Sequence, residues 1–165
     1  MSTLVFLETH DGEPTKGSLG VLSKAAALGA GDVSAVVLGT CVRDAAAKAG
    51  AHGASRVYVV EDDALSAPLP QPRVDALEAV VAESGAENIL FAASVLAADV
   101  ASGLAARLEA GLNWDLTDLR VESGELVGTR PALGDTVLVD VQPTSTPRIG
   151  LVLSLIHISE PTRRS

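Results

Sequence analysis

Residues 87–118 constrain the fold of this chain more than any other segment. They begin with a short, uninterrupted apolar run at 89–93, which is typical of a strand that is covered on both faces. From Leu96 to Leu108, apolar residues recur at every fourth position and polar residues fall on the other side. This pattern predicts an amphipathic helix that is stopped by Gly111. We therefore expect a buried strand followed by a helix that packs back on the sheet.

The preceding part of the chain repeats this alternation. Strands are predicted at 4–7, 33–38 and 56–60, and helices at about 18–28, 42–49 and 72–84. Four strands that alternate with four helices predict an α/β fold, a three-layer α/β/α Rossmann-like arrangement with a mainly parallel sheet. After Gly111, the segments 116–121, 126–130 and 137–141 predict short strands that form an antiparallel hairpin appendage.

Composition excludes several classes of function. A chain of 165 residues that is 47% hydrophobic and 2% aromatic suits one domain with a core of Ala, Val and Leu. Its net charge of −9 disfavours DNA, RNA or an anionic membrane as a partner, because these bind clustered Lys and Arg. The single cysteine, Cys41, excludes a disulfide framework or a thiolate metal site within one chain.

Targeting signals are not evident in the sequence. The first residues carry no basic cluster, and the apolar run at 4–7 is too short for a signal peptide. No segment approaches the roughly 20 apolar residues that a membrane-spanning helix needs. We therefore expect a cytoplasmic protein without membrane insertion.

We expect the last residues to have a different origin from the rest of the chain. Residues 153–163 read LSLIHISEPTR, which matches residue for residue the translation of a transposase mosaic-end adapter used in short-read sequencing libraries. We expect a natural domain at 1–152 and a non-native adapter translation at 153–165, so His157 has no functional meaning. On this interpretation the natural reading frame was cut where a sequencing insert ended.

Common phosphate-binding and metal-binding patterns are absent from the sequence. The one Gly-x-Gly, at 29–31, precedes a strand instead of following one, which favours a helix C-cap over a dinucleotide fingerprint. Neither Lys16 nor Lys24 follows a glycine-rich phosphate loop. His10 and His52 lie in polar connections without a third ligand at metal spacing, so solvated loop histidines are the favoured interpretation.

Four other residues have both a chemical and a structural interpretation. Cys41 follows a strand end near Arg43, where a thiolate can be stabilised, but without a histidine partner a buried or half-buried bystander is favoured. Asp62 and Asp63 favour a solvated acidic bend over a general acid and base pair. Trp114 favours packing at the sheet edge over anchoring a partner.

Four segments resemble a known family. They are LVFLETHDG at 4–12, DVASGLAARL at 99–108, GLNWDLTD at 111–118 and TRP at 129–131. Together they are similar to the N-terminal domain of the electron transfer flavoprotein alpha subunit, and the likeness covers about 4–152. The resemblance implies the adenine nucleotide alpha hydrolase-like variety of the Rossmann-like fold.

The resemblance also implies a function for the whole protein. In that family a heterodimer carries electrons through FAD, from dehydrogenases such as the acyl-CoA dehydrogenases of fatty acid beta-oxidation to a quinone oxidoreductase in the membrane. FAD is held mainly by the C-terminal domain of the alpha subunit, whereas the N-terminal domain is a scaffold and a docking surface for the beta subunit. We therefore expect no FAD in this fragment, assign no catalytic, cofactor-binding or metal-binding residue, and expect an electron carrier subunit and not an enzyme.

Two other functions stay open on the sequence alone. One is an adenine-nucleotide-binding module of universal-stress type, although Glu8-Thr-His and Ala93-Ser-Val supply no phosphate-gripping glycines at the predicted strand ends. The other is a purely structural interaction domain, which differs from the first hypothesis only in its partner.

Overall fold

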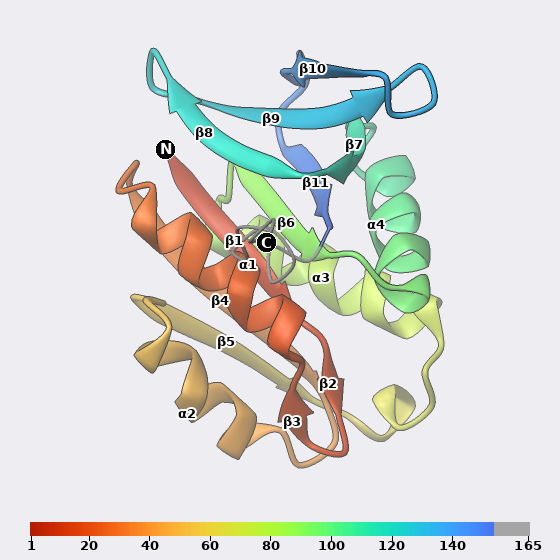
Figure 1. The fold of residues 1–165 in the computed structure, drawn as a ribbon. Coiled ribbons are helices and arrows are strands. Elements are labelled where there is room, and N and C mark those ends of the chain that lie inside the picture. Colours follow the sequence, from red (N-terminus) through yellow and green to blue (C-terminus); the bar gives the residue numbers. More distant parts are fainter. Residues whose placement is uncertain (154–165) are drawn as a thin grey trace, which may run out of the picture.

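The computed structural model describes residues 1–153 as a parallel sheet between two covering layers (Figure 1). The six strands of the main sheet lie in the order β5-β4-β1-β6-β11-β7, and every neighbouring pair is parallel. The predicted three-layer α/β fold is confirmed. The predicted adapter segment, from residue 154 onward, lies outside the described residues.

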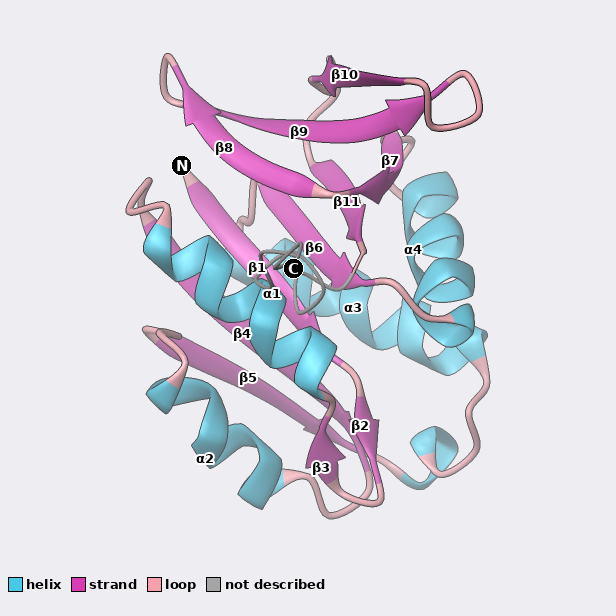
Figure 2. Cartoon of the chain, in the orientation of Figure 1, coloured by secondary structure: helices cyan, strands magenta, loops and turns pink. Residues whose placement is uncertain are grey.

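The elements follow one another along the chain with short connections (Figure 2). Their bounds are β1 (Ser2–Leu7), β2 (Thr9–His10), β3 (Glu13–Pro14), α1 (Lys16–Ala27), β4 (Asp32–Gly39), α2 (Arg43–Ala51), β5 (Arg56–Glu61), the 3-10 turn η1 (Asp63–Leu65), α3 (Pro70–Ser84), β6 (Asn88–Ala92), α4 (Val95–Arg107), β7 (Leu112–Leu116), β8 (Asp118–Glu122), β9 (Glu125–Ala132), β10 (Val137–Val141) and β11 (Arg148–Val152). None of the helices within residues 1–153 has the length and apolar character needed to cross a bilayer.

The core has two halves, one on each face of the main sheet. Alternate residues of β1 divide between them: Leu4 and Phe6 face α3 and α4, whereas Val5 and Leu7 face α1 and α2. All five residues of β6 are buried. Four residues of the apolar run predicted at 89–93 lie in this strand, whereas Ala93 follows it and is exposed. On this strand, Phe91 packs against Phe6 with ring centroids 5.3 Å apart.

The antiparallel appendage is a sheet of order β10-β9-β8, and it covers the face of the main sheet that α1 and α2 leave free (Figure 1). Leu119 of β8 and Leu126 of β9 are buried in the same half of the core as the α1 side chains. We call these three strands the arched sheet. One covering layer is thus part helix and part sheet.

Three helix ends have a serine or glycine of the type that caps helices, whereas the stop predicted for α4 lies elsewhere. Ser94 caps α4, because its Oγ accepts a hydrogen bond from the Ala97 N–H at 2.9 Å. Gly29 follows the last turn of α1 with φ 60°, and Gly85 ends α3 with φ 63°, so the predicted C-cap at 29–31 is confirmed. The predicted stop at Gly111 is wrong, because Glu109 (φ 50°) takes the left-handed position two residues earlier.

Two strands of the main sheet depart from the sequence-based prediction. The strand expected at 116–121 is divided at Thr117, because Leu116 ends β7, which joins the main sheet, and Asp118 begins β8, which joins the arched sheet. Strand β11 was not predicted, yet it lies between β6 and β7. Its five residues follow a proline at 147 and are too short to reveal a period.

The arched sheet is tied to α1 by an ion pair. The Lys24 ammonium lies 2.8 Å from Oδ1 of Asp118, the first residue of β8. The Lys24 hydrogen bond is the main cause that lowers the pKa of the Asp118 carboxyl, and the Leu119 N–H adds to it at 2.8 Å. The folded state therefore favours the ionised carboxylate more than the unfolded state does.

The stability of the chain is expected to depend on Asp118 in a pH-dependent manner. A lowered pKa stabilises the fold above the unfolded-state value of about 3.9, and this contribution is lost as the pH falls through the folded-state value. The substitution Asp118→Asn is therefore expected to lower the free energy of unfolding at neutral pH. The difference in this free energy between the wild type and the variant should become smaller below about pH 4. Urea unfolding at a series of pH values measures it. The exposed Asp99→Asn is the charge-matched control, and a pH-independent difference for Asp118→Asn would contradict the assignment.

Candidate functional site

The residues considered for metal or nucleophile chemistry do not converge. His10 is exposed in the β2-β3 hairpin. His52 lies at the end of α2, and its Nδ1 is 3.0 Å from Oγ of Ser23 in α1. Within residues 1–153, no group of three His, Cys, Asp or Glu side chains is arranged to hold a metal ion. His10 is therefore solvated as predicted, although it belongs to the two-residue strand β2, whereas His52 is half-buried at the C-cap of α2 and is not a fully solvated loop residue.

The environment of Cys41 differs from the prediction. Cys41 is exposed and has φ 55°, so the interpretation as a buried or half-buried bystander is wrong. The tight turn after β4 directs the chain into α2 and leaves the thiol at the surface. The Arg43 guanidinium, considered as a thiolate partner, instead pairs with Oε2 of Glu61 at 3.1 Å, and this contact lowers the pKa of the Glu61 carboxyl.

The acidic bend after β5 is a structural cap. Asp62 and Asp63 are both exposed, as predicted. The Asp62 Oδ1 accepts a hydrogen bond from the Ala64 N–H at 2.8 Å and so begins the turn η1. This hydrogen bond explains why an aspartate stands at position 62.

A cleft lies at the carboxyl ends of β1 and β4. Its polar lining comes from five places in the chain: Glu8 after β1, Thr9 of β2, Thr40 after β4, Ser66 after η1 and Arg73 of α3. The Arg73 guanidinium donates to the carbonyls of Leu65, Ala67 and Leu69 at 2.7–3.0 Å. The Arg73 guanidinium therefore stabilises the loop between η1 and α3 through these hydrogen bonds. The sequence offers no signal for this role, because the carbonyls belong to a connection without a motif.

An exposed apolar surface lies on the outermost strand of the arched sheet. Within β10, Val137, Leu138 and Val139 have exposed fractions of 42%, 70% and 37%, and Leu133 before the strand has 79%. We call these four residues the β10 patch. Strand β10 pairs with β9 on one side, and no other described strand pairs with its second edge. An aliphatic strand exposed on both faces and along one edge is unusual in a monomer and marks a contact surface.

Trp114 lies on the edge strand β7 and contacts Arg130, the β9 residue that pairs with Val139 of β10. The position at the sheet edge agrees with the prediction, but the side chain is 55% exposed, so it is not a fully packed residue. The Arg130 guanidinium of β9 stacks over the indole ring, with the carbon of the guanidinium 5.4 Å from the ring centroid. This contact links the main sheet to the arched sheet and orients the indole.

Arg120 links the three strands of the arched sheet through its side-chain contacts. From β8 it pairs with Glu122 on its own strand and with Asp140 of β10, each at 2.6 Å, and it donates to Oγ1 of Thr129 on β9 at 2.9 Å. The Arg120 hydrogen bond lowers the pKa of the Asp140 carboxyl, with a further contribution from Thr129. The β10 patch is therefore held on a preformed platform.

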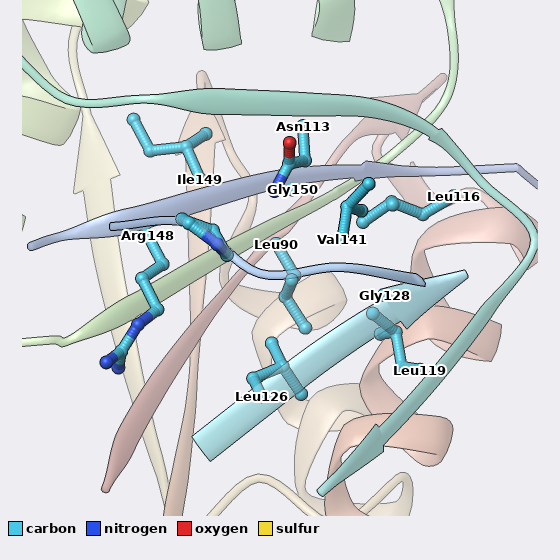
Figure 3. A pocket seen from close by; sticks show the side chains of 11 residues that line it. Leu90, Asn113, Leu116, Leu119, Leu126, Gly128, Val141, Arg148, Ile149 and Gly150 are labelled. Carbon is cyan, nitrogen blue, oxygen red and sulfur yellow. The ribbon is translucent and has the colours of Figure 1, made fainter. Parts of the chain in front are cut away.

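A small cavity separates the arched sheet from the main sheet (Figure 3). Apolar side chains from both sheets, including Leu90, Leu116, Leu119 and Leu126, point into it. A Cβ at position 128 in its wall would lie 2.7 Å from Cδ2 of Leu116, so any residue larger than glycine there would displace the Leu116 side chain. The lining holds no carboxylate, histidine or cysteine, so the cavity can accept apolar packing but supplies no acid, base or nucleophile.

Comparison with known proteins identifies relatives of the whole described region. Residues 3–157 match the family described as "Electron transfer flavoprotein domain". Electron transfer flavoprotein subunit alpha from Syntrophomonas wolfei is 33% identical over 150 residues, covering 91% of this chain and 47% of that protein. The alpha subunit from Mycobacterium tuberculosis is 35% identical over 156 residues, with 90% and 48% covered. Protein FixB from Rhizobium meliloti is 32% identical over 145 residues, with 83% and 41% covered. The chain thus spans about half the length of these curated relatives.

Proposed function

Because this chain belongs to the electron transfer flavoprotein domain family, we propose that it is the N-terminal scaffold domain of an alpha subunit and that it docks against a beta subunit. The main observation is the match to alpha subunits over nine-tenths of the chain but about half of each relative. In the complete heterodimer, FAD would carry electrons from dehydrogenases, such as acyl-CoA dehydrogenases, to a quinone oxidoreductase. Within residues 1–153 the domain contributes shape and contacts, not a catalytic site.

The residues described do not fit an FAD site within this domain. The loop after β1 places Glu8 where a dinucleotide fold has a glycine-rich turn. The cavity beneath the arched sheet is lined mainly by aliphatic side chains, and of its polar side chains, Asn113 and Arg148, the arginine already pairs with Glu125. We therefore propose that flavin binding belongs to the part of the relatives that this chain does not cover. The cytoplasmic location stays a prediction.

The β10 patch, together with Trp114, is the surface that best suits a docked subunit. It combines aliphatic side chains with an aromatic anchor beside an arginine, and tryptophan and arginine are the residue types that contribute most to protein interfaces. The chain is acidic overall, which favours a beta subunit whose docking face is apolar with a basic rim.

Co-expression with a beta subunit from a related electron transfer flavoprotein tests the proposal. We expect the two chains to elute together at equal stoichiometry from a sizing column, and the isolated chain to elute without flavin absorbance. An absence of any complex at micromolar concentrations would refute the docking role. A tightly held flavin with quenched fluorescence in the isolated chain would refute the scaffold role.

The boundary of the natural domain is part of the same proposal. We propose that residues 1–152 are natural and that 153–165 are an adapter translation, supported by the residue-for-residue match at 153–163. Sequencing the source DNA through and beyond codon 152 decides it. A native reading frame that continues through the LSLIHISEPTR codons and then stops would overturn the boundary.

A further inference from the structure

The main sheet changes its direction of winding between β1 and β6. From β1 the chain proceeds outward through β4 to β5, whereas the elements after β6 fill the other side as β11 and β7. The connection after β1 leads to α1 on one face, and the connection after β6 leads to α4 on the other face. In open α/β sheets, the crevice beyond the carboxyl ends of two such strands is the usual place for a ligand. In this chain that crevice lies between Glu8 and Ser94.

A side chain of the protein itself occupies this place. The Ser94 Oγ donates a hydrogen bond to Oε2 of Glu8, while the same Oγ accepts from the Ala97 N–H in the first turn of α4. The Glu8 carboxylate therefore lies at the positive end of a 13-residue helix, where an anionic ligand group would otherwise be favoured. Within residues 1–153, no Lys, Arg or His lies at ion-pair distance from it. The Arg73 guanidinium in the same cleft interacts with the Glu8 carboxylate at longer range, but its hydrogen bonds go to the carbonyls of the loop.

The backbone of Glu8 is fixed as firmly as its side chain. Its N–H donates to Oγ of the fully buried Ser18 at 3.1 Å, and its carbonyl accepts from the Thr15 N–H at 2.8 Å. Thr15 and Ser18 form the N-terminal cap of α1. Glu8 is thus attached through its backbone to the first turn of α1 and through its carboxylate to the N-cap of α4, on the opposite face of the sheet. Rotation of the carboxylate out of the crevice would break the Ser94 contact, whereas the backbone would stay in place.

We infer that Glu8 excludes anionic ligands from the switch point, because its carboxylate takes the anion position and so closes the adjoining cleft to nucleotides. A phosphate brought to the α4 N-terminus would meet a fixed negative charge at close range. The wild-type chain consequently behaves as a scaffold. It has the sheet topology and the cleft of a nucleotide-binding module but does not bind nucleotides. No ligand is assigned to the natural chain by this inference.

Titration of the 165-residue chain with AMP and, separately, with inorganic phosphate tests the inference. We expect no shifts of the Ser94–Ala97 amide resonances in the wild type at about 10 mM AMP. The substitution Glu8→Ser, which removes the carboxylate and opens space, should tighten AMP binding at these amides at least about tenfold. Glu8→Gln keeps an acceptor for Ser94 and removes only the charge, so it should give part of the gain.

The controls separate this effect from a general change of charge. Glu83→Gln alters the same charge at an exposed site near the end of α3 and is expected to behave as the wild type. Shifts at the α4 amides of the wild type with either probe would overturn the inference, and so would folded Glu8 variants that gain no affinity. If Glu8→Ser does not fold, the Glu8→Gln and wild-type titrations decide the question. None of these outcomes bears on docking to a beta subunit.

Discussion

Replacing Phe91 with alanine is expected to lower the free energy of unfolding by about 3–5 kcal/mol. Phe91 is completely buried in the central strand β6, where its ring lies 5.3 Å from that of Phe6. Truncation removes the aromatic contact and leaves a cavity that the neighbouring strands β1 and β11 cannot fill, because both are fixed by ladders on either side. Urea denaturation followed by circular dichroism measures the loss. With only one tryptophan and two phenylalanines in the chain, the aromatic contribution to the core is concentrated in this pair.

Val95→Ala is the matched control for that measurement. Val95 begins α4 and is 85% exposed, so its truncation should change stability by no more than about 0.5 kcal/mol. An equal effect of the two substitutions would mean that β6 is not the centre of the core. The predicted difference is large compared with the total stability of a typical domain, so the Phe91 variant is expected to unfold at a markedly lower urea concentration.

Introducing a charge at Leu138 is expected to weaken binding of a beta subunit by about 30-fold or more, without unfolding the chain. Leu138 is the most exposed residue of β10, at 70%, so an aspartate there is well solvated in the free domain. In a complex centred on the β10 patch, the same aspartate would be desolvated without a partner. Surface plasmon resonance with an immobilised beta subunit measures the affinity.

The control for this prediction is Val95→Asp, which places the same charge on an exposed aliphatic residue outside the β10 patch. It should leave the affinity within a factor of about two to three, since rim or distant charges contribute little. If Leu138→Asp binds as the wild type does, the β10 patch is not the docking surface. If Val95→Asp weakens binding of the beta subunit instead, the docking surface lies at the carboxyl ends of the strands of the main sheet.

The sequence is sufficient where one residue pattern decides the structure. The apolar run of β6 and the fourfold spacing in α4 lead directly to the buried strand and its helix, and Ser94 has the side chain of an N-cap. Strand β11 could not be found in this manner, because five residues covered on both faces look like many other apolar segments. Its place between β6 and β7 depends on tertiary packing.

The functional features depend even more on topology. Glu8 and Ser94 are 86 residues apart, and their contact follows only from the adjacency of β1 and β6. Either residue alone has an ordinary interpretation as a polar loop residue. The exposure of Cys41 and of the β10 patch was likewise hidden, since a Val-Leu-Val segment predicts a strand but does not tell whether another element covers it.

The covering layer that is part helix and part sheet has a consequence for how this lineage can diversify. Where a helix covers a sheet, a partner recognises the side chains on the outer face of that helix, so a substitution of one of them can weaken binding. The arched sheet instead presents a strand whose peptide groups are the same for any residue except proline. A partner strand that hydrogen-bonds to those peptide groups would still bind after many side-chain substitutions on either chain. Relatives about one-third identical would then share the same contact with their partner.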